Sequence, residues 1–296
     1  MCIRDSIQEM DPGAKALESG HPLAANQEVN GQSQIRSRCV FLLYRAEERM
    51  NNLRKLSYYI YSILEMVFHI KNWPSLLGIF LRRENEGAQF IKLRLPPLTL
   101  AVRGAMDTWA VKETFIDQFY SKYGEPVHNG WVVVDIGAGI GDYAIHAAYG
   151  NPDAVVYAFE PFPSSHQLLV QNLTNNAISN VVVFQQAVWS HDGWLTLDLS
   201  SGEPLQISSR DNDGLMDDHD VVRVEAVSLK SLFQRENLSH IDMLKLDCEG
   251  AEYEILMGAS IKELRKIRRI IMEYHDLDSA HHHGVLEDFL TTQGFS

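Results

Sequence analysis

A buried strand that breaks into a glycine-rich turn and then a helix is the feature of this sequence that most limits its fold. The run WVVVDIGAGIGDYA covers residues 131–144, and its consecutive valines are typical of a parallel strand covered on both faces. Gly137, Gly139 and Gly141 let the chain turn sharply and bring its backbone against a ligand, because side chains there would collide or be strained. The pattern predicts an open α/β sheet that receives an adenosine cofactor, with a helix that begins near Asp142.

The spacing of the three glycines separates two classes of cofactor. Nicotinamide and flavin sites use GxGxxG, in which the N-terminus of the helix faces a pyrophosphate. Counted from Gly137, the third glycine would fall at Asp142, whose carboxylate would repel a pyrophosphate. An acid at the end of the strand followed by GxGxG instead favours S-adenosylmethionine, which has no phosphate and whose ammonium group Asp135 would attract.

A second predicted strand, residues 154–159, also indicates an adenosine ligand. It ends at Glu160, 19 residues after Gly141, where a carboxylate can accept hydrogen bonds from both hydroxyls of a ribose. Such charge-assisted hydrogen bonds contribute roughly 1.5–3 kcal/mol each. Nicotinamide sites also use a ribose carboxylate, so Glu160 does not choose between the cofactors. After a third predicted strand, residues 181–184, Gln186 is a candidate contact for the edge of the adenine.

Five segments of the chain, read in order, resemble the FkbM family of methyltransferases: VVVDIGAGIGDYA, AFEPFPSSHQLLVQNLTNN, FQQAVWS, IDMLKLDCEGAEYEIL and IIMEYHD. The match runs from about residue 93 to residue 295, and KLDCEGAE is its most specific part. The family most often has KIDVEG there, so Cys248 replaces an aliphatic residue, a small apolar exchange. The resemblance implies a class I methyltransferase fold and methyl transfer to a hydroxyl on a sugar, glycolipid or polyketide. The family's cofactor positions match Asp135, Gly137, Gly139 and Glu160.

The expected fold is therefore α/β, a class I methyltransferase sheet with core strand order 3-2-1-4-5 and a helical segment before it. The fourth and fifth core strands are predicted at residues 241–246 and 270–272. Because residues 294–296 read as the start of a sixth strand, strands six and seven are expected to be missing by truncation, which would expose the edge of strand five. Alternation predicts an antiparallel pair at residues 195–199 and 221–229, with an exposed acidic loop between them.

The chain is expected to divide into four parts. These are a disordered segment at 1–30, a basic helical segment at 31–90, short strands and a lead-in helix at 91–130, and the S-adenosylmethionine-binding domain at 131–296. In the third part, the sequence predicts two short strands or an extended pair over 90–102 around two prolines, and one helix over 108–123.

Charge is distributed unevenly along the chain, whose net charge is −13. Residues 31–103 contain 12 Lys and Arg against 5 Asp and Glu, whereas residues 104–296 contain 12 against 29. Arg45, Arg49 and Leu53, with residues 56–67, suggest an amphipathic helix, and a second helix is predicted at residues 73–81. This segment would contact an anionic membrane surface or a phosphorylated glycan acceptor, or would be a helical cap with solvated arginines. The acidic remainder, without an NPPY-type motif, argues against nucleic-acid methylation.

Candidate residues for the acceptor side lie at the carboxyl ends of the fourth and fifth predicted strands, where chemistry in open α/β folds collects. Asp247 and Glu249 follow the fourth strand and His275 follows the fifth. Methylation of a hydroxyl requires a base near its oxygen, and His275 or Asp247 would serve. A structural ion pair between Lys245 and Asp247 is the rival interpretation, because both lie on one face of the strand. Glu249 and Glu252 would alternatively cap the next helix.

Other patterns argue against metal and disulfide chemistry. Cys2, Cys39 and Cys248 are far apart without a CxxC pair, and no signal peptide is visible, which favours a reducing, cytoplasmic compartment. The acidic loop at 211–220 lacks the spacing of a cation loop, and the histidines at 281–283 are expected in a flexible loop. Two alternatives to an enzyme of this kind stay open: a methyltransferase-like binding module without turnover, and a nucleotide-sugar oxidoreductase, which Asp142 disfavours.

Overall fold

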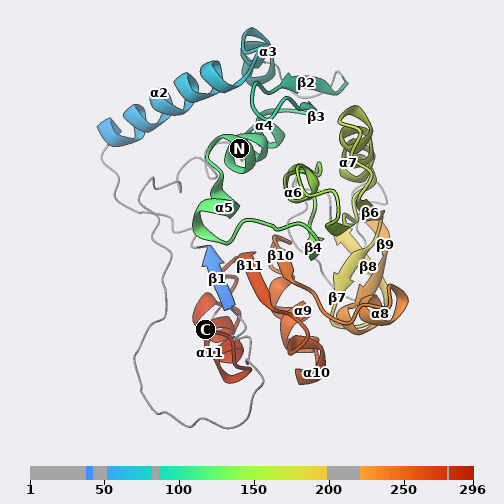
Figure 1. Ribbon diagram of the computed structural model, residues 1–296. Helices are drawn as coiled ribbons and strands as arrows, with labels where there is room; N and C mark the ends of the chain where they lie inside the picture. Colours follow the sequence, from blue (N-terminus) through green and yellow to red (C-terminus); the bar gives the residue numbers. More distant parts are fainter. Residues whose placement is uncertain (1–37, 43–51, 82–86, 199–220, 279) are drawn as a thin grey trace. The chain divides into compact units, whose positions relative to one another are not determined.

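The computed structural model describes residues 38–42, 52–81, 87–198, 221–278 and 280–296 (Figure 1). These residues divide into two compact units. Unit 1 contains the described parts of residues 43–131 and residues 137–185, and unit 2 contains residues 38–42, 132–136 and the described residues from 186 onward. The predicted disordered segment at 1–30 and the acidic loop at 211–220 lie outside the described residues.

The central sheet has the strand order that the sequence predicts. Its six strands run in the order β1-β11-β10-β4-β5-β6, so that the five core strands follow the order 3-2-1-4-5. They are β4 (Val132–Ile136), β5 (Val155–Phe159), β6 (Val181–Phe184), β10 (Met243–Leu246) and β11 (Arg269–Glu273). β10 pairs in parallel with both β4 and β11, and all four of its residues are buried, as expected of a strand covered on both faces.

An additional strand lies at the edge that was expected to be exposed. β1 (Arg38–Leu42) pairs in parallel with β11, with Cys39 opposite Ile270 and Phe41 opposite Met272. The basic helical segment predicted at 31–90 therefore includes a strand at residues 38–42 that the sequence did not indicate, and the backbone groups of β11 on this side are paired. The strand was missed because its partner lies at the other end of the chain, and pairing of that kind leaves no local signal.

Unit 1 begins with two helices and a hairpin that agree with the sequence. α2 (Asn52–His69) contains Leu53 and residues 56–67 of the first predicted helix, whose Arg45 and Arg49 lie outside the described residues, and α3 (Pro74–Leu81) matches the second predicted helix. β2 (Gln89–Lys92) and β3 (Thr99–Val102) pair antiparallel on either side of Pro96 and Pro97. The single helix expected over 108–123 is instead three short helices.

These three helices are α4 (Ala105–Val111), the π-helix η1 (Lys112–Ile116) and α5 (Phe119–Tyr123). The break has an identifiable cause. Lys112 is buried, and its ammonium group lies 2.6 Å from Asp117 and 4.0 Å from Glu65 of α2. Gln118 then adopts a left-handed conformation with φ 52°, which no α-helix continues through. The buried ion pair therefore fixes the chain at the point where the helical pattern of the sequence would have continued.

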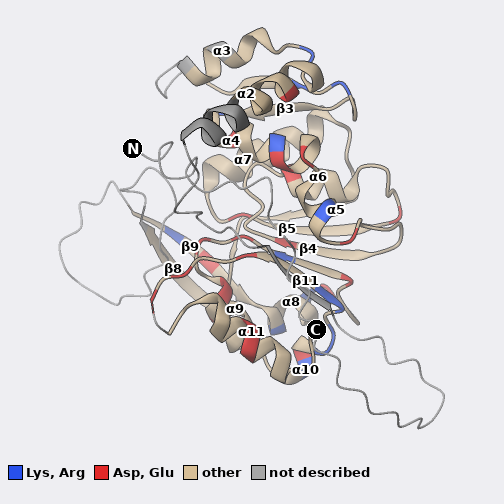
Figure 2. Ribbon diagram, turned by 90° about the vertical axis from the view of Figure 1, so that its left-hand side faces the viewer, with Lys and Arg blue, Asp and Glu red and all other residues tan. Residues whose placement is uncertain are grey.

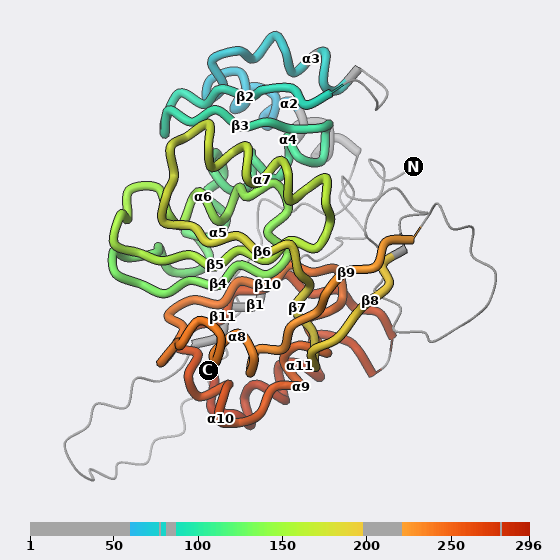
Figure 3. Tube along the Cα trace, turned by 90° about the vertical axis from the view of Figure 1, so that its right-hand side faces the viewer, coloured from blue at the N-terminus to red at the C-terminus, as the bar shows by residue number. Residues whose placement is uncertain are grey.

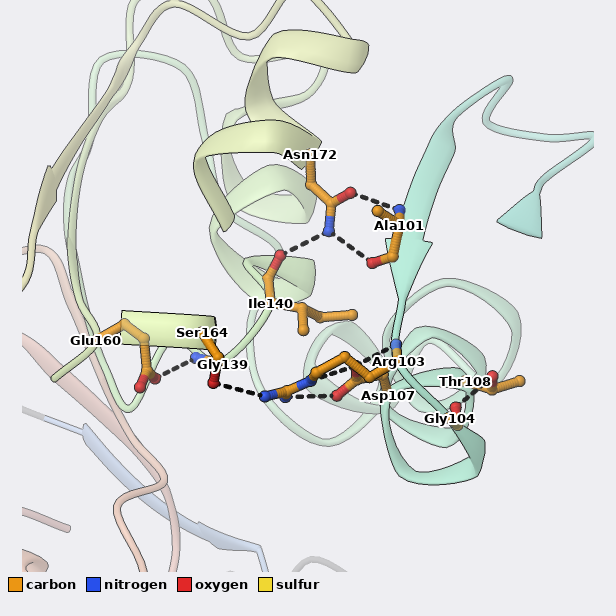
Figure 4. A network of polar contacts seen from close by, with 10 residues as sticks. All are labelled: Ala101, Arg103, Gly104, Asp107, Thr108, Gly139, Ile140, Glu160, Ser164 and Asn172. Carbon is orange, nitrogen blue, oxygen red and sulfur yellow. Dashed lines mark hydrogen bonds and ion pairs between the residues drawn. The ribbon is translucent and has the colours of Figure 1, made fainter. Parts of the chain in front are cut away.

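Asn172 joins three segments of unit 1. It lies on α7 (Pro163–Asn175), is fully buried, and its oxygen accepts a hydrogen bond from the Ala101 amide at 2.5 Å. Its amide nitrogen donates to the carbonyl oxygens of Ala101 at 3.1 Å and Ile140 at 2.9 Å (Figure 4). This side chain therefore ties α7 to β3 and to the loop before α6 (Asp142–Ala148).

Replacing Asn172 with Leu is expected to lower the free energy of unfolding by about 3 kcal/mol, because three buried backbone groups lose their partner. Urea unfolding measures the loss. The matched control is Asn175→Leu, on the exposed side of the same helix, which should change stability by less than about 0.5 kcal/mol. Equal effects from the two substitutions would contradict this role of Asn172.

Unit 2 adds a second, three-stranded sheet. β8 (Gly193–Asp198) and β9 (Val221–Ser228) form the predicted antiparallel pair, and β7 (Ala187–Trp189), which the sequence did not predict, joins β9 in parallel. The helices of this unit are α8 (Leu229–Arg235), α9 (Glu252–Gly258), α10 (Ile261–Leu264) and α11 (His283–Thr292). α11 follows β11 along the chain.

Candidate active site

The glycine turn of unit 1 has the backbone that its sequence requires. Gly137, Gly139 and Gly141 have φ angles of 74°, 53° and 84°, all in the left-handed region that favours glycine. The amides of Gly137 and Ala138 both donate to the carbonyl oxygen of Phe159, at 3.1 and 3.0 Å, which fastens the turn to the end of β5. α6 begins at Asp142, as predicted.

Two of these glycines have different surroundings. A Cβ at Gly139 would meet no heavy atom within 4 Å, so this position opens onto free space. A Cβ at Gly141 would lie 2.9 Å from Cγ of Leu169, a fully buried residue of α7. Gly141 is therefore required for packing, whereas Gly139 leaves room for a ligand to approach the backbone.

Glu160 lies at the end of β5 and is fixed by backbone amides. It is 4% exposed, and its two oxygens accept hydrogen bonds from Gly139 at 2.7 Å and from Phe162 at 2.9 Å (Figure 4). The sequence predicted Glu160 as a ligand for ribose but gave no sign that it also holds the glycine turn. The open position at Gly139 and a buried carboxylate bonded to it fit an adenosine ligand.

Arg103 is a further residue of this region that sequence reasoning missed. Its guanidinium forms two hydrogen bonds with Asp107, both at 2.9 Å, and a third with the Ser164 hydroxyl at 3.3 Å (Figure 4). Ser164 belongs to the first turn of α7, four residues after Glu160. The RGAMD spacing would have indicated the pair with Asp107, but nothing in the sequence links Arg103 to the start of α7.

Asp142 occupies the first position of α6. Its carboxylate accepts a hydrogen bond from the Thr114 hydroxyl, so a negative charge lies where a pyrophosphate would need the amides of the helix N-terminus. This placement agrees with the argument from the glycine spacing against a dinucleotide.

In unit 2, a buried lysine connects two of the predicted acids. Lys245 lies opposite Asp135 in the ladder between β10 and β4, and its ammonium nitrogen is 3.4 Å from Oδ1 of Asp135. The same nitrogen is 3.3 Å from Oδ2 of Asp247. The ion pair predicted between Lys245 and Asp247 is therefore present, and it extends to Asp135.

The Asp135 side chain is fully buried, and that of Lys245 is almost so. A buried carboxylate requires a compensating partner, and Lys245 provides a positive charge at this point of the ladder. The sequence predicted Asp135 as a partner for the ammonium group of a cofactor and did not indicate that a lysine of the chain already contacts it.

A second charged cluster surrounds His275, which follows β11. Its Nε2 is 3.2 Å from Oε2 of Glu249, and its Nδ1 is 3.5 Å from Oε1 of Glu252. Glu252 is fully buried in the first turn of α9, and its Oε1 also accepts a hydrogen bond from the Cys248 amide at 3.0 Å. Among the described residues, Oε2 of Glu252 has no hydrogen-bond partner. The structure thus places His275 beside Glu249, two residues that the sequence predicts on the acceptor side. It also places Glu252 beside His275.

The two carboxylates change the acidity of His275. Burial alone would lower its pKa, but the close contact with the Glu252 carboxylate and the charges of Glu249, Glu252 and Asp247 outweigh burial and raise the pKa to about 10. His275 is therefore an imidazolium at neutral pH. This state argues against His275 as the base that accepts the proton of an acceptor and favours a role in holding the two glutamates.

The raised pKa predicts how the contribution of His275 to stability depends on pH. Because the folded state binds this proton more tightly than the unfolded state, the contribution is complete below about pH 6.5 and is lost as the pH rises towards 10. The difference in unfolding free energy between the wild type and His275→Gln should therefore shrink over this range, as measured by urea unfolding.

His166→Gln serves as the control, because burial lowers the pKa of His166 and its protonation affects stability only at lower pH. The difference for this control should stay constant between pH 7 and pH 10 on the same reasoning. A constant difference for His275→Gln over the same interval would contradict the raised pKa.

Two further residues of interest are Cys248, in the KLDCEGAE segment, and Gln186, the predicted contact for the adenine. Burial raises the pKa of the Cys248 thiol well above its ordinary value, so it is a protonated side chain and not a nucleophile at neutral pH. Gln186 directly precedes β7, and its contact with an adenine stays a prediction.

Two of the three consecutive histidines lie against carboxylates. Nδ1 of His281 is 3.0 Å from Asp278, and Nδ1 of His283, the first residue of α11, is 3.0 Å from Asp276. The expectation of a flexible loop is therefore wrong at His283, which begins a helix. Within the described residues, no group of His, Cys, Asp and Glu is arranged to hold a metal ion.

The fold, with its parallel sheet in the order 3-2-1-4-5, and the glycine turn with its acid define an S-adenosylmethionine-dependent methyltransferase of class I. Residues 135–296 match the model of the methyltransferase FkbM domain, which covers more than half of the sequence. The chain belongs to the FkbM methyltransferase family.

Known proteins of this kind are similar to the chain at low identity. It is 26% identical over 215 residues to the 31-O-demethyl-FK506 methyltransferase FkbM of Streptomyces tacrolimicus, covering 64% of this chain and 83% of that protein. It is 27% identical over 144 residues to the hexuronic acid methyltransferase AglP of Haloferax volcanii, covering 49% and 56%. The solved structure of a precorrin-6y C5,15-methyltransferase from Geobacter metallireducens GS-15 aligns with a TM-score of 0.33 at 16% identity, covering 57% and 65%.

Proposed function

We propose that the chain transfers the methyl group of S-adenosylmethionine to a hydroxyl on a sugar, glycolipid or polyketide-type acceptor. The observation that carries this proposal is the open glycine turn bonded to the buried carboxylate of Glu160, which suits an adenosine without a pyrophosphate. The names of two relatives support the acceptor class, since one includes 31-O-demethyl-FK506 and the other a hexuronic acid.

In this proposal the cofactor is held by residues of the turn and of the strand ends. Glu160 would accept the hydroxyls of the ribose, and the open backbone at Gly139 would let the nucleoside approach. Bound S-adenosylmethionine supplies an electrophilic methyl group. The full set of proposed cofactor residues is Asp135, Gly137, Gly139, Gly141, Glu160 and Gln186.

The proposed roles on the acceptor side follow from charge. An alcohol gains nucleophilicity when a base takes its proton, and a positioned base contributes roughly 10² to 10⁴ in rate. We assign this base to Asp247, because the pKa of about 10 leaves His275 without the capacity to accept a proton at neutral pH. Glu249 and His275 would then position the acceptor as a charged pair, 3.2 Å apart.

Isotope-labelled methyl donor, incubated with the protein and cell extract and followed by mass spectrometry, tests the reaction. The expected result is that the wild type forms a product carrying the labelled methyl group. The Asp247→Asn variant should form no such product although it still binds S-adenosylmethionine. His275→Gln should keep measurable turnover and raise the KM of the acceptor. Binding of the donor without any labelled product from active extracts would instead favour a binding module.

The proposal also covers the location of the protein in the cell. The three widely spaced cysteines of the sequence favour a reducing environment, and on this basis we propose a cytoplasmic location. Fractionation of cells that express the tagged full chain measures it.

A further inference from the structure

α2 carries large apolar side chains on its solvent side. Ile60, Leu64 and Phe68 are spaced by four residues and form one stripe, and Phe68 is 72% exposed. Ile63 and Tyr61, beside this stripe, are also more than half exposed. The helix packs through a different side, since Ser62, Met66 and Ile70 are buried. The apolar stripe therefore does not serve the packing of α2 onto unit 1.

The exposed apolar residues continue onto the neighbouring hairpin. The Lys71 amide donates to the carbonyl of Lys92 at 2.7 Å, and the Arg94 amide donates to the carbonyl of His69 at 2.8 Å, so the end of α2 is fastened to β2. Figure 3 shows α2, α3 and β2 together at one end of unit 1. Phe90 is exposed on β2, and Leu95, which follows the strand, is 79% exposed.

Positive charge accompanies these apolar side chains. Lys71, Lys92 and Arg94 are all exposed, and Lys92 and Arg94 alternate with the buried Ile91 and Leu93. Figure 2, in which basic residues are blue, shows blue segments near α3 and β3. Within the described residues 60–81 and 87–100, Glu65 is the one acid, and Lys112 lies 4.0 Å from its carboxylate. This local balance is opposite to that of the whole chain, whose net charge is −13.

We propose that this surface, defined by Ile60, Leu64, Phe68, Lys71, Phe90, Lys92, Arg94 and Leu95, binds peripherally to an anionic lipid bilayer. A helix with exposed large apolar residues and nearby cations is suited to the interface, where the apolar side chains enter the boundary of the acyl chains and the cations meet anionic headgroups. No helix among the described residues is long and apolar enough to cross a membrane.

Charge favours lipid over a second copy of the chain. In a twofold dimer the same patch meets itself, so Lys71, Lys92 and Arg94 of one copy would lie near those of the other. An anionic bilayer presents the opposite charge to all three and has no fixed shape to match. The inference is independent of the proposed acceptor, because it rests on residues outside the glycine turn.

Sedimentation with vesicles tests the surface. The full chain should bind vesicles of phosphatidylcholine with phosphatidylglycerol and bind phosphatidylcholine alone at least about tenfold more weakly. Leu64→Glu with Phe68→Glu should lower binding to the mixed vesicles by roughly tenfold or more, since two apolar anchors are lost. Lys92→Glu with Arg94→Glu should remove the preference for phosphatidylglycerol.

The matched control is Val170→Glu with Ile261→Glu, two exposed apolar residues elsewhere in the chain, which should leave vesicle binding unchanged. Circular dichroism and S-adenosylmethionine affinity verify that each variant is folded. Failure of the full chain to sediment with mixed vesicles, or equal binding by the Leu64 and Phe68 variant, would overturn the inference. A dimer that this variant converts to a monomer, without vesicle binding by the wild type, would instead assign the patch to a second copy.

Discussion

Replacing Glu160 with Gln is expected to weaken the binding of S-adenosylmethionine on the order of 100-fold, as measured by isothermal titration calorimetry. The substitution removes the charge that would strengthen hydrogen bonds from the ribose hydroxyls, and about 3 kcal/mol corresponds to this factor. It also places an amide NH₂ group, which cannot accept a hydrogen bond, where one carboxylate oxygen accepts from a backbone amide. The amide that loses its acceptor is either that of Gly139, at 2.7 Å, or that of Phe162, at 2.9 Å. The loss of charge and the loss of a backbone hydrogen bond are both expected to weaken cofactor binding at the glycine turn.

The control for this prediction is Glu287→Gln on the exposed side of α11. It changes the net charge of the chain by the same amount and should leave the affinity within about twofold, because exposed charges are screened. An affinity of Glu160→Gln that equals that of the wild type would exclude Glu160 from the cofactor site.

The glycines of the turn provide the second large prediction. Gly141→Ala should lower the free energy of unfolding by about 3 kcal/mol, because a left-handed alanine costs about 1–2 kcal/mol and its Cβ would also lie 2.9 Å from the buried Leu169. Gly139→Ala should cost only the backbone strain, since its Cβ meets no atom within 4 Å, but should weaken cofactor binding at least about tenfold.

Gly130→Ala measures the strain by itself. Gly130 has φ 80° and its Cβ would also meet nothing within 4 Å, yet it lies before β4 and outside the turn. Urea unfolding and calorimetry on the three variants should therefore separate strain, packing and ligand contact. If Gly139→Ala binds the cofactor as well as Gly130→Ala does, the open space at Gly139 is not where the ligand approaches.

The core of the fold could be predicted because its strands are continuous apolar runs. Residues such as Val133, Val134 and Leu244 are fully buried, and their pattern needs no information from distant parts of the chain. Turn residues and prolines fixed the ends of several elements: Gly141 precedes α6, and Pro163 is the first residue of α7.

The elements that were missed depend on distant or buried partners. β1 pairs with β11 from the opposite end of the sequence, and β7 has only three residues that join β9. The helix expected over 108–123 is interrupted at Gln118 because buried Lys112 contacts Asp117. Hydrophobic periodicity reports which side chains are buried, but it does not report a buried ion pair or a pairing across the chain.

The sequence predicted which residues lie in the candidate site, but it predicted few of the contacts between them. Strand alternation indicated the contact of Lys245 with Asp247, but the contact of Lys245 with Asp135 depends on the register between β10 and β4. The sequence offered His275 as a possible base, whereas the nearby carboxylates of Glu249, Glu252 and Asp247 raise its pKa to about 10. The neighbours of a titratable group, which set its pKa, come from elements far apart in the sequence.

Calorimetric titration of the full chain with S-adenosylmethionine and, separately, with NAD tests most directly whether the glycine turn and Glu160 receive an adenosine without a pyrophosphate. The account predicts saturable binding of S-adenosylmethionine at one site and no measurable heat from NAD under the same conditions. Saturable binding of NAD, or no uptake of S-adenosylmethionine by the folded protein, would contradict it.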